Sequence, residues 1–113
     1  MTKALIRSAE QLDLSAELPA ILQISSEDFR SLRSGERALE PGTDSWERAL
    51  KIVSLFRMLV SLLGTAERAR TWLGSPNEAL GARPVELLST PDGERVYRYL
   101  DAVTKNELRL PRS

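Results

Sequence analysis

The sequence predicts an all-α protein. Apolar residues recur at three- and four-residue steps along most of the chain, no segment alternates convincingly with a period of two, and no run of β-branched residues is sustained. With 113 residues, of which 42% are hydrophobic, the chain can bury one modest core. Two small helical lobes that share this core would also fit.

Two short helices are expected at the N-terminus. Residues 3–11 have a helical apolar face, which consists of Leu5, Ile6, Ala9 and Leu12. Ser15 is a good N-cap residue and predicts that a second helix begins there and continues to residue 22. Pro19 falls near the first turn of that helix, where its missing backbone donor costs least. A turn at residues 23–24 follows.

A third helix is predicted to begin at residues 25–26, which are both serine and therefore both suitable N-caps. Glu27 or Asp28 then lies in the first turn, where a carboxylate interacts favourably with the helix dipole. Gly35 predicts the end of this helix. Residues 37–42 are expected to form a loop that closes with a Pro-Gly turn.

The clearest helical pattern comes next. Asp44 as N-cap, with Glu47 three residues later, predicts a capping-box start, and Gly64 predicts the end. Seven apolar residues at helical spacing predict the inner face: Trp46, Ala49, Leu50, Val53, Phe56, Val60 and Leu63. Three further leucines widen this face, so we expect the central core helix to be buried on more than one side.

Three further helices and one short capped turn are expected in the rest of the chain. A helix begins at Thr65, and a short turn with Ser75 as N-cap follows it. Pro84 begins a second short helix, and Thr90 with Pro91 begins the last one. The inner face of the last helix is predicted to consist of Val96, Tyr97, Leu100 and Val103.

The composition excludes several classes of function. The chain has no histidine and no cysteine, which removes serine–histidine, cysteine–histidine and zinc–histidine chemistry as well as disulfides. We therefore expect no enzyme, no metal and no cofactor. No apolar run is long enough to span a bilayer, and the N-terminus lacks a signal-peptide core. A cytoplasmic protein is expected.

Residues 72–93 combine several fixed spacings. A helix with a tryptophan is followed by a Pro-Asn turn, a Leu-Gly-x-Arg-Pro step at residues 80–84, a Leu-Leu pair, and a glycine at the start of the last helix. This pattern resembles the toxin-binding domain of bacterial antitoxins of the MbcA/ParS/Xre family. With the helices on either side, the resemblance extends over residues 46–103.

The resemblance implies an antitoxin that holds a toxin inactive, typically a RES-domain toxin that degrades NAD or transfers ADP-ribose. Many such antitoxins also repress their own operon. The candidate toxin contacts are Trp72, Asn77, Arg83, Leu87, Leu88, Arg109 and Arg112. The first two also have structural interpretations, because Trp72 can belong to the core and Asn77 can satisfy local backbone groups.

Three of these residue sets leave alternatives open. Leu87 and Leu88 cannot easily both be buried on a short helix, so one of them is expected at an interface. Arg83 can pair with a nearby carboxylate or reach one on a partner. In the tail, Arg109 and Arg112 can engage an acidic pocket on the toxin or belong to a frayed terminus.

Residues 14–35 resemble the second and third helices of an Xre-type helix-turn-helix, in which residues 26–34 would be the recognition helix. The candidate DNA contacts are Ser26, Arg30, Arg33 and Arg37. Glu27 and Asp28 oppose this interpretation, because carboxylates at that end repel phosphates. Residues 1–40 also hold five basic and seven acidic residues. We therefore expect DNA affinity to be weak, absent or dependent on oligomerisation.

The predicted organisation has three parts: a degenerate Xre-type helix-turn-helix at residues 1–42, a helical toxin-binding domain at residues 43–104, and a tail at residues 105–113. The leading hypothesis is a homodimeric type II antitoxin bound to a RES toxin encoded by a neighbouring gene. The alternative is a stand-alone transcriptional regulator whose C-terminal domain only dimerises. An apolar surface around Leu59 and Leu88 is expected to serve either the dimer or the toxin.

Overall fold

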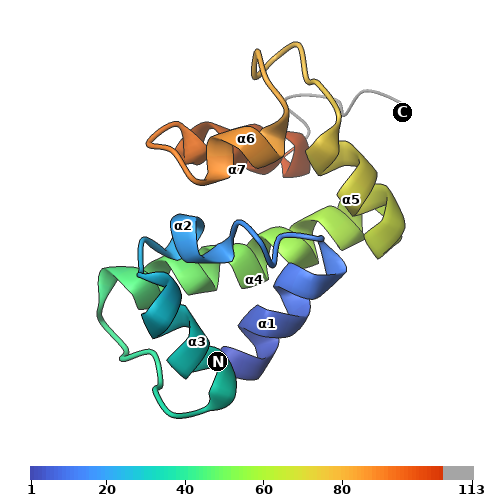
Figure 1. Cartoon of the computed structure of the whole chain (residues 1–113). Helices are drawn as coiled ribbons and strands as arrows, with labels where there is room; N and C mark the ends of the chain where they lie inside the picture. The colour runs from blue at the N-terminus through green and yellow to red at the C-terminus, as the bar shows by residue number, and fades with distance from the viewer. Residues whose placement is uncertain (106–113) are drawn as a thin grey trace.

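The computed structural model describes residues 1–105, and these residues form an all-α fold (Figure 1). The helices are α1 (Thr2–Gln11), α2 (Leu18–Leu22), α3 (Ser26–Ser34), α4 (Asp44–Leu63), α5 (Ala66–Gly74), α6 (Pro84–Leu88) and α7 (Gly93–Thr104). Within these residues the only β-type pairing is one isolated bridge between Asn77 and Ala82. The predicted fold class is confirmed.

Helix α4 is the centre of the molecule. It contacts α1 and α2, which precede it, and α5 and α7, which follow it. In Figure 1, α1 and α3 lie on one side of α4, and α6 and α7 lie on the other. Side chains from both sides meet in a single hydrophobic core, to which α4 contributes Ala49, Ile52, Leu55 and Leu59.

Several helix ends follow the capping signals of the sequence. The Ser25 hydroxyl accepts a hydrogen bond from the Asp28 backbone N–H at 3.0 Å, which identifies Ser25 as the N-cap of α3. Gly35 ends that helix with a φ of +87°, a conformation that suits glycine. The Thr65 hydroxyl accepts from the Arg68 N–H at 3.1 Å and caps α5. These three predictions are confirmed.

The predicted start of α2 at Ser15 is wrong, because α2 begins at Leu18 with Glu17 as its N-cap. In a helix capped by Ser15, the Ser15 carbonyl would accept its hydrogen bond from residue 19. Pro19 has no N–H, so that bond cannot form. The first helical bond instead connects the Ile21 N–H to the Glu17 carbonyl at 3.0 Å.

The N-cap of α4 is Thr43 and not Asp44, which corrects the prediction by one residue. The Thr43 hydroxyl accepts from the Trp46 N–H at 3.2 Å and donates to the Glu40 carbonyl at 2.7 Å. Asp44 and Glu47 lie in the first turn, where their carboxylates favour the helix dipole without forming a capping box.

The predicted inner face of α4 is also wrong in part. Of the seven residues assigned to it, Ala49 is buried, while Leu50 is 39% exposed and the others are half-buried. The core face is instead centred on Ile52, Leu55 and Leu59. Because Leu59 is fully buried and Leu88 is 7% exposed, they do not form the expected apolar surface. Periodicity could not choose the face, since α4 is apolar on most of its circumference.

Two elements of the C-terminal half differ from the prediction. Ser75 does not cap the turn at residues 75–81, since its hydroxyl donates back to the Thr71 carbonyl at 2.6 Å. Helix α7 begins at Gly93, because residues 90–92 form a turn in which the Thr90 hydroxyl accepts from the Asp92 N–H at 3.1 Å. On α7 the buried tyrosine is Tyr99, whereas Tyr97 is half-buried.

Candidate functional site

An aromatic pair connects the helices of the C-terminal lobe, which we define as α5, α6, α7 and the turn at residues 75–83. The Trp72 and Tyr99 rings stack with centroids 6.1 Å apart and an interplanar angle of 16°. Both side chains are buried, and the Trp72 Nε1 has no hydrogen-bond acceptor within residues 1–105. Trp72 therefore belongs to the core, where it joins α5 to α7.

Asn77 organises the turn between α5 and α6. Its side-chain oxygen accepts from the Leu80 N–H at 3.2 Å, and its carbonyl accepts from the Gly81 N–H at 2.8 Å. Its own N–H donates to the Ala82 carbonyl at 3.1 Å. Asn77 is 6% exposed, so its amide serves the local backbone and is not on the surface.

Both Leu87 and Leu88 are buried, with exposures of 9% and 7%, which overturns the expectation that one of them is exposed. Helix α6 contacts both α5 and α7, so adjacent side chains can both find apolar neighbours. A Cβ on Gly93 would lie 3.1 Å from the Leu87 carbonyl oxygen and 3.2 Å from that of Leu88. Glycine thus permits the start of α7 to approach the end of α6 closely.

The exposed edge of this lobe consists of the turn that precedes α6. Arg83 is exposed, with its Nε 4.0 Å from the Glu86 carboxylate, a distance at the limit of an ion pair. Glu78, in the same turn, is also exposed. Arg95 on α7 stabilises this edge, because its Nη2 donates a hydrogen bond to the Leu80 carbonyl at 3.0 Å. Arg95 was not identified from the sequence. Arg83 is therefore the one candidate toxin contact within residues 1–105 that a partner can reach directly.

A polar and aromatic contact connects α4 to α7. Lys51 forms an ion pair with Glu94, and its ammonium nitrogen lies 5.4 Å from the centroid of the Tyr97 ring. Burial raises the pKa of the Tyr97 hydroxyl to about 12. The sequence offered no signal for this contact, because Lys51 and Glu94 are far apart along the chain.

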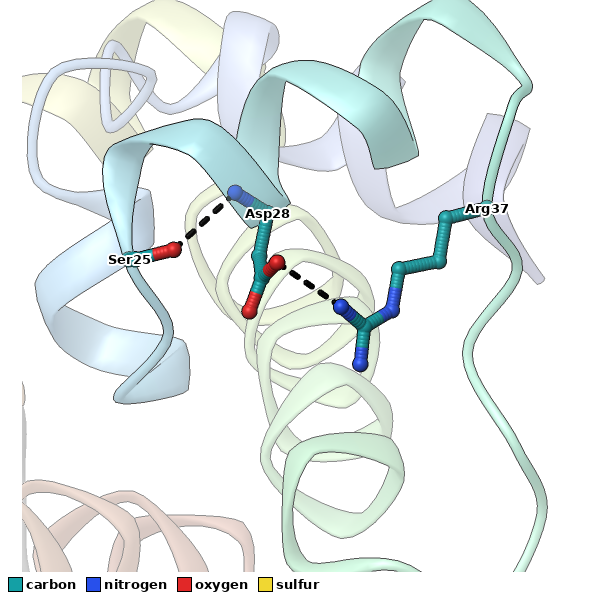
Figure 2. Close-up of polar contacts among 3 residues, drawn as sticks. All are labelled: Ser25, Asp28 and Arg37. Atoms are coloured by element: carbon teal, nitrogen blue, oxygen red, sulfur yellow. Dashed lines mark hydrogen bonds and ion pairs between the residues drawn. The ribbon is translucent and has the colours of Figure 1, made fainter.

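The candidate DNA contacts are not equivalent. Ser26, Arg30 and Arg33 are exposed on α3. Arg37, in the loop that follows, forms an ion pair with Asp28 at 2.8 Å, while Ser25 caps the same helix through the Asp28 N–H (Figure 2). Asp28 therefore orients the Arg37 guanidinium, so that any phosphate would compete with this carboxylate for Arg37.

No metal site or membrane-spanning helix is evident in the part of the chain that the structure describes. Residues 1–105 contain no group of three or more acidic side chains that could hold a metal ion. Within the same residues, no single helix is long and apolar enough to cross a membrane. Helices α4 and α5 pass that test only as a pair, by length and composition, and they are bent by 106°. Arg109 and Arg112 lie outside the described residues.

These features define a class of protein: a small helical protein whose C-terminal lobe is a packed helical unit with an exposed polar edge. The family follows from sequence comparison. Residues 58–104 match the model of the antitoxin Xre/MbcA/ParS C-terminal toxin-binding domain, so over these residues the chain is similar to that family. A search of curated proteins gave no match. The predicted resemblance is confirmed, and the match begins within the second half of α4.

Proposed function

We propose that the protein is the antitoxin of a type II toxin–antitoxin system and that it binds and neutralises a RES-type toxin encoded by a neighbouring gene. The observation that carries this proposal is the match of residues 58–104 to an antitoxin toxin-binding domain. The RES chemistry of the partner, whether NAD degradation or ADP-ribosylation, rests on the family resemblance. On this proposal the protein acts by binding and catalyses no reaction.

The burial of the candidate residues separates proposed direct toxin contacts from residues proposed to support the binding surface. Arg83 is exposed at the edge of the C-terminal lobe and is proposed to contact the toxin directly. Arg109 and Arg112 are proposed to contact an acidic pocket of the toxin. Trp72 and Asn77 are buried, as are Leu87 and Leu88, and these four are proposed to hold the surface in shape.

The proposed domain organisation retains the boundaries at residues 42 and 104. Residues 1–42 are proposed as a degenerate helix-turn-helix, residues 43–104 as the toxin-binding domain and residues 105–113 as the tail. Because α4 packs against helices on both sides of the first boundary, the two domains share one core and are not expected to move independently.

Co-expression with the adjacent open reading frame tests the function. We expect the neighbouring product to inhibit growth when expressed alone, and this protein to relieve the inhibition and to co-purify with its partner. Arg83→Glu should weaken co-purification, whereas Arg7→Glu, the same charge change at an exposed position of α1, should not. A harmless neighbour that fails to co-purify would contradict the antitoxin proposal.

A second candidate function is transcriptional regulation, either as autoregulation by the antitoxin or as the sole activity of the chain. The observation in its favour is that Arg30 and Arg33 are exposed on α3, which follows the short helix α2. The first turn of α3 is acidic, so binding is expected to be weak unless several copies engage the operator together. A salt-sensitive, sequence-specific gel shift with the protein alone would favour regulation, and Arg30→Ala should then abolish it.

A further inference from the structure

Helix α4 carries a second stripe, in which three apolar side chains do not pack against the core. Among residues 1–105, nearly every aliphatic or aromatic side chain of valine size or larger packs in or against the hydrophobic core. Four such side chains do not: Met1, Trp46, Leu50 and Val60. Three of these four lie on α4, and Leu50 is 39% exposed. Trp46 and Val60 are half-buried, and apolar side chains that stay accessible outside the core are typical of an interaction surface.

The spacing of this stripe is that of a coiled coil. Trp46, Leu50, Val53, Arg57 and Val60 follow one another at steps of four, three, four and three residues. We call these five residues the α4 seam. A repeat of seven residues keeps such a seam facing a single partner helix along its length, whereas an ordinary surface helix drifts. Val53 is half-buried beside the core, and Arg57 is exposed.

We propose that the α4 seam binds the α4 seam of a second copy of this chain in the antiparallel direction. In the favoured register, a two-fold axis passes between residues 51 and 52. Leu50 of each copy then lies opposite Val53 of the other copy, so this contact occurs once on each side of the axis. The same register places Arg57 opposite Trp46 of the second copy. Each end of the pair then contains one guanidinium–indole contact, and the centre contains only aliphatic side chains.

Charge selects this arrangement over the alternatives. In a parallel, in-register pair, Arg57 would face Arg57 of the second copy, and the two like charges would repel. In the antiparallel register, Arg57 lies beside Glu47 of the second copy, because Glu47 follows Trp46 directly. Both side chains are exposed, and within residues 1–105 neither forms an ion pair. The seam together with the neighbouring Glu47 is therefore complementary to itself in charge as well as in apolarity.

The small size of the seam determines how tight the dimer is. The five residues span about 21 Å of helix at 1.5 Å per residue. This is a short interface, and interfaces that bury less than about 1,200 Å² in total are typical of weak, reversible association. We therefore expect a monomer–dimer equilibrium with a dissociation constant on the order of micromolar to tens of micromolar.

Sedimentation equilibrium of the full chain between 1 and 200 μM tests the interface. The apparent mass should rise from that of a monomer towards that of a dimer. Leu50→Glu should raise the dissociation constant at least about tenfold, because it places two carboxylates near the two-fold axis. Arg7→Glu is the matched control on α1, and circular dichroism verifies that each variant remains helical.

A charge exchange identifies the partner as a second copy. Arg57→Glu should weaken the dimer, because the new carboxylate lies beside Glu47 of the other copy. Adding Glu47→Arg should restore association, since the exchanged charges again face one another across the two-fold axis. A seam that binds a different protein would show no such restoration of the dimer.

Cysteine cross-linking tests the direction of the pair, and the natural chain contains no cysteine to interfere. Trp46→Cys and Arg57→Cys should form a mixed disulfide dimer when they are combined. Neither should cross-link with itself, because eleven residues of offset separate the two thiols by about 16 Å. The mixed dimer also retains the second Arg57–Trp46 contact, at its other end.

The proposal gives an interface to the homodimer that the sequence predicts, and none of its tests contains a toxin, so it and the proposed antitoxin function can each fail without the other. A protein that stays monomeric at 200 μM overturns it. So does a dimer that is insensitive to both Leu50→Glu and Arg57→Glu, since another surface would then be responsible. If the protein alone is monomeric and Leu50→Glu instead blocks co-purification with the neighbouring product, the seam belongs to the toxin interface.

Discussion

At the scale of single residues, the C-terminal lobe depends on polar groups that serve its own backbone. Asn77 closes the turn between α5 and α6, and Arg95 donates to the Leu80 carbonyl within the same turn. Gly93 allows the backbone of α7 to approach α6. Four residues of the family pattern, Trp72, Asn77, Leu87 and Leu88, are thus buried within the lobe.

Replacing Asn77 by alanine is expected to destabilise the protein by about 1 kcal/mol, since a buried side-chain acceptor for the Leu80 N–H is lost. Glu78→Ala, at the neighbouring exposed position, should change the free energy of unfolding by less than about 0.5 kcal/mol. Urea denaturation followed by circular dichroism measures both. Equal stability of the Asn77 variant and the wild type would show that the side chain does not support the turn.

The raised pKa of Tyr97 predicts a loss of stability at alkaline pH. An unfolded tyrosine titrates near pH 10, whereas the folded hydroxyl titrates near 12 because burial disfavours the phenolate. The folded state therefore retains its proton where the unfolded state has lost it. The associated stability is fully present below pH 10 and is lost as the pH rises towards 12.

Between pH 9 and pH 11 the wild type should lose about 1 kcal/mol more stability than Tyr97→Phe, which has no phenol to ionise. Lysine titration occurs in the same range, but it affects both proteins and cancels in the comparison. Urea unfolding at the two pH values provides the measurement. Identical pH dependence of the two proteins would contradict the burial of this hydroxyl.

At the scale of the helices, hydroxyl caps determine where three elements begin. Ser25, Thr43 and Thr65 each accept a hydrogen bond from the backbone N–H three residues later. Each helix begins at the residue after its cap, and the neighbouring carboxylates occupy the first turn. This pattern also explains why Asp44, which has a suitable side chain, is not the cap of α4.

The assignment of the α4 cap can be tested with a matched pair of variants. Thr43→Ala should cost about 1 kcal/mol of stability, because the Trp46 N–H loses its acceptor. Asp44→Ala should cost about 0.5 kcal/mol, since only a favourable charge near the helix dipole is removed. Urea denaturation of the two variants provides the comparison. A larger loss for Asp44→Ala would restore Asp44 as the cap.

At the scale of the whole molecule, α4 makes the N-terminal and C-terminal halves into one structural unit. Leu55 is fully buried in the middle of this helix, and the core cluster extends from Leu5 on α1 to Val103 on α7. The ion pair between Lys51 and Glu94 adds a polar contact between α4 and α7. Without the buried side chains of α4, the core of each half would be incomplete.

The shared core predicts a single unfolding transition. Circular dichroism and tryptophan fluorescence should give the same urea midpoint, although Trp46 and Trp72 lie in different helices. Leu55→Ala should lower that midpoint for both probes by the equivalent of 2–5 kcal/mol, roughly the usual cost of a buried leucine. Two separate transitions would mean that the halves fold independently.

The proposed role of the tail leads to a separate prediction about activity. Removal of the residues after Lys105 should weaken toxin neutralisation, because Arg109 and Arg112 are lost, while the stability of residues 1–105 remains close to that of the full chain. Growth rescue during toxin expression, together with urea denaturation, distinguishes the two effects. Full rescue by the truncated protein would remove the tail from the inhibitory contact.

The sequence by itself determined the all-α class, the caps of α3 and α5, the ends of α3 and α4, and the resemblance of the C-terminal part to an antitoxin toxin-binding domain. These features depend on local chemistry: hydroxyl caps, glycine ends, helical periodicity and a set of fixed spacings. The start of α2 could also have been derived, because the missing N–H of Pro19 is visible in the sequence.

Only the tertiary structure decided which faces are buried. Helix α4 is apolar on most of its circumference, so the contacts with α1, α5 and α7 select the core face and leave Trp46, Leu50 and Val60 outside. The same reason buries both Leu87 and Leu88, since α6 has neighbours on two sides. Hydrophobic periodicity is a property of one helix at a time. The burial of a helix face depends on which other helices pack against it, and the fold of the whole chain determines this.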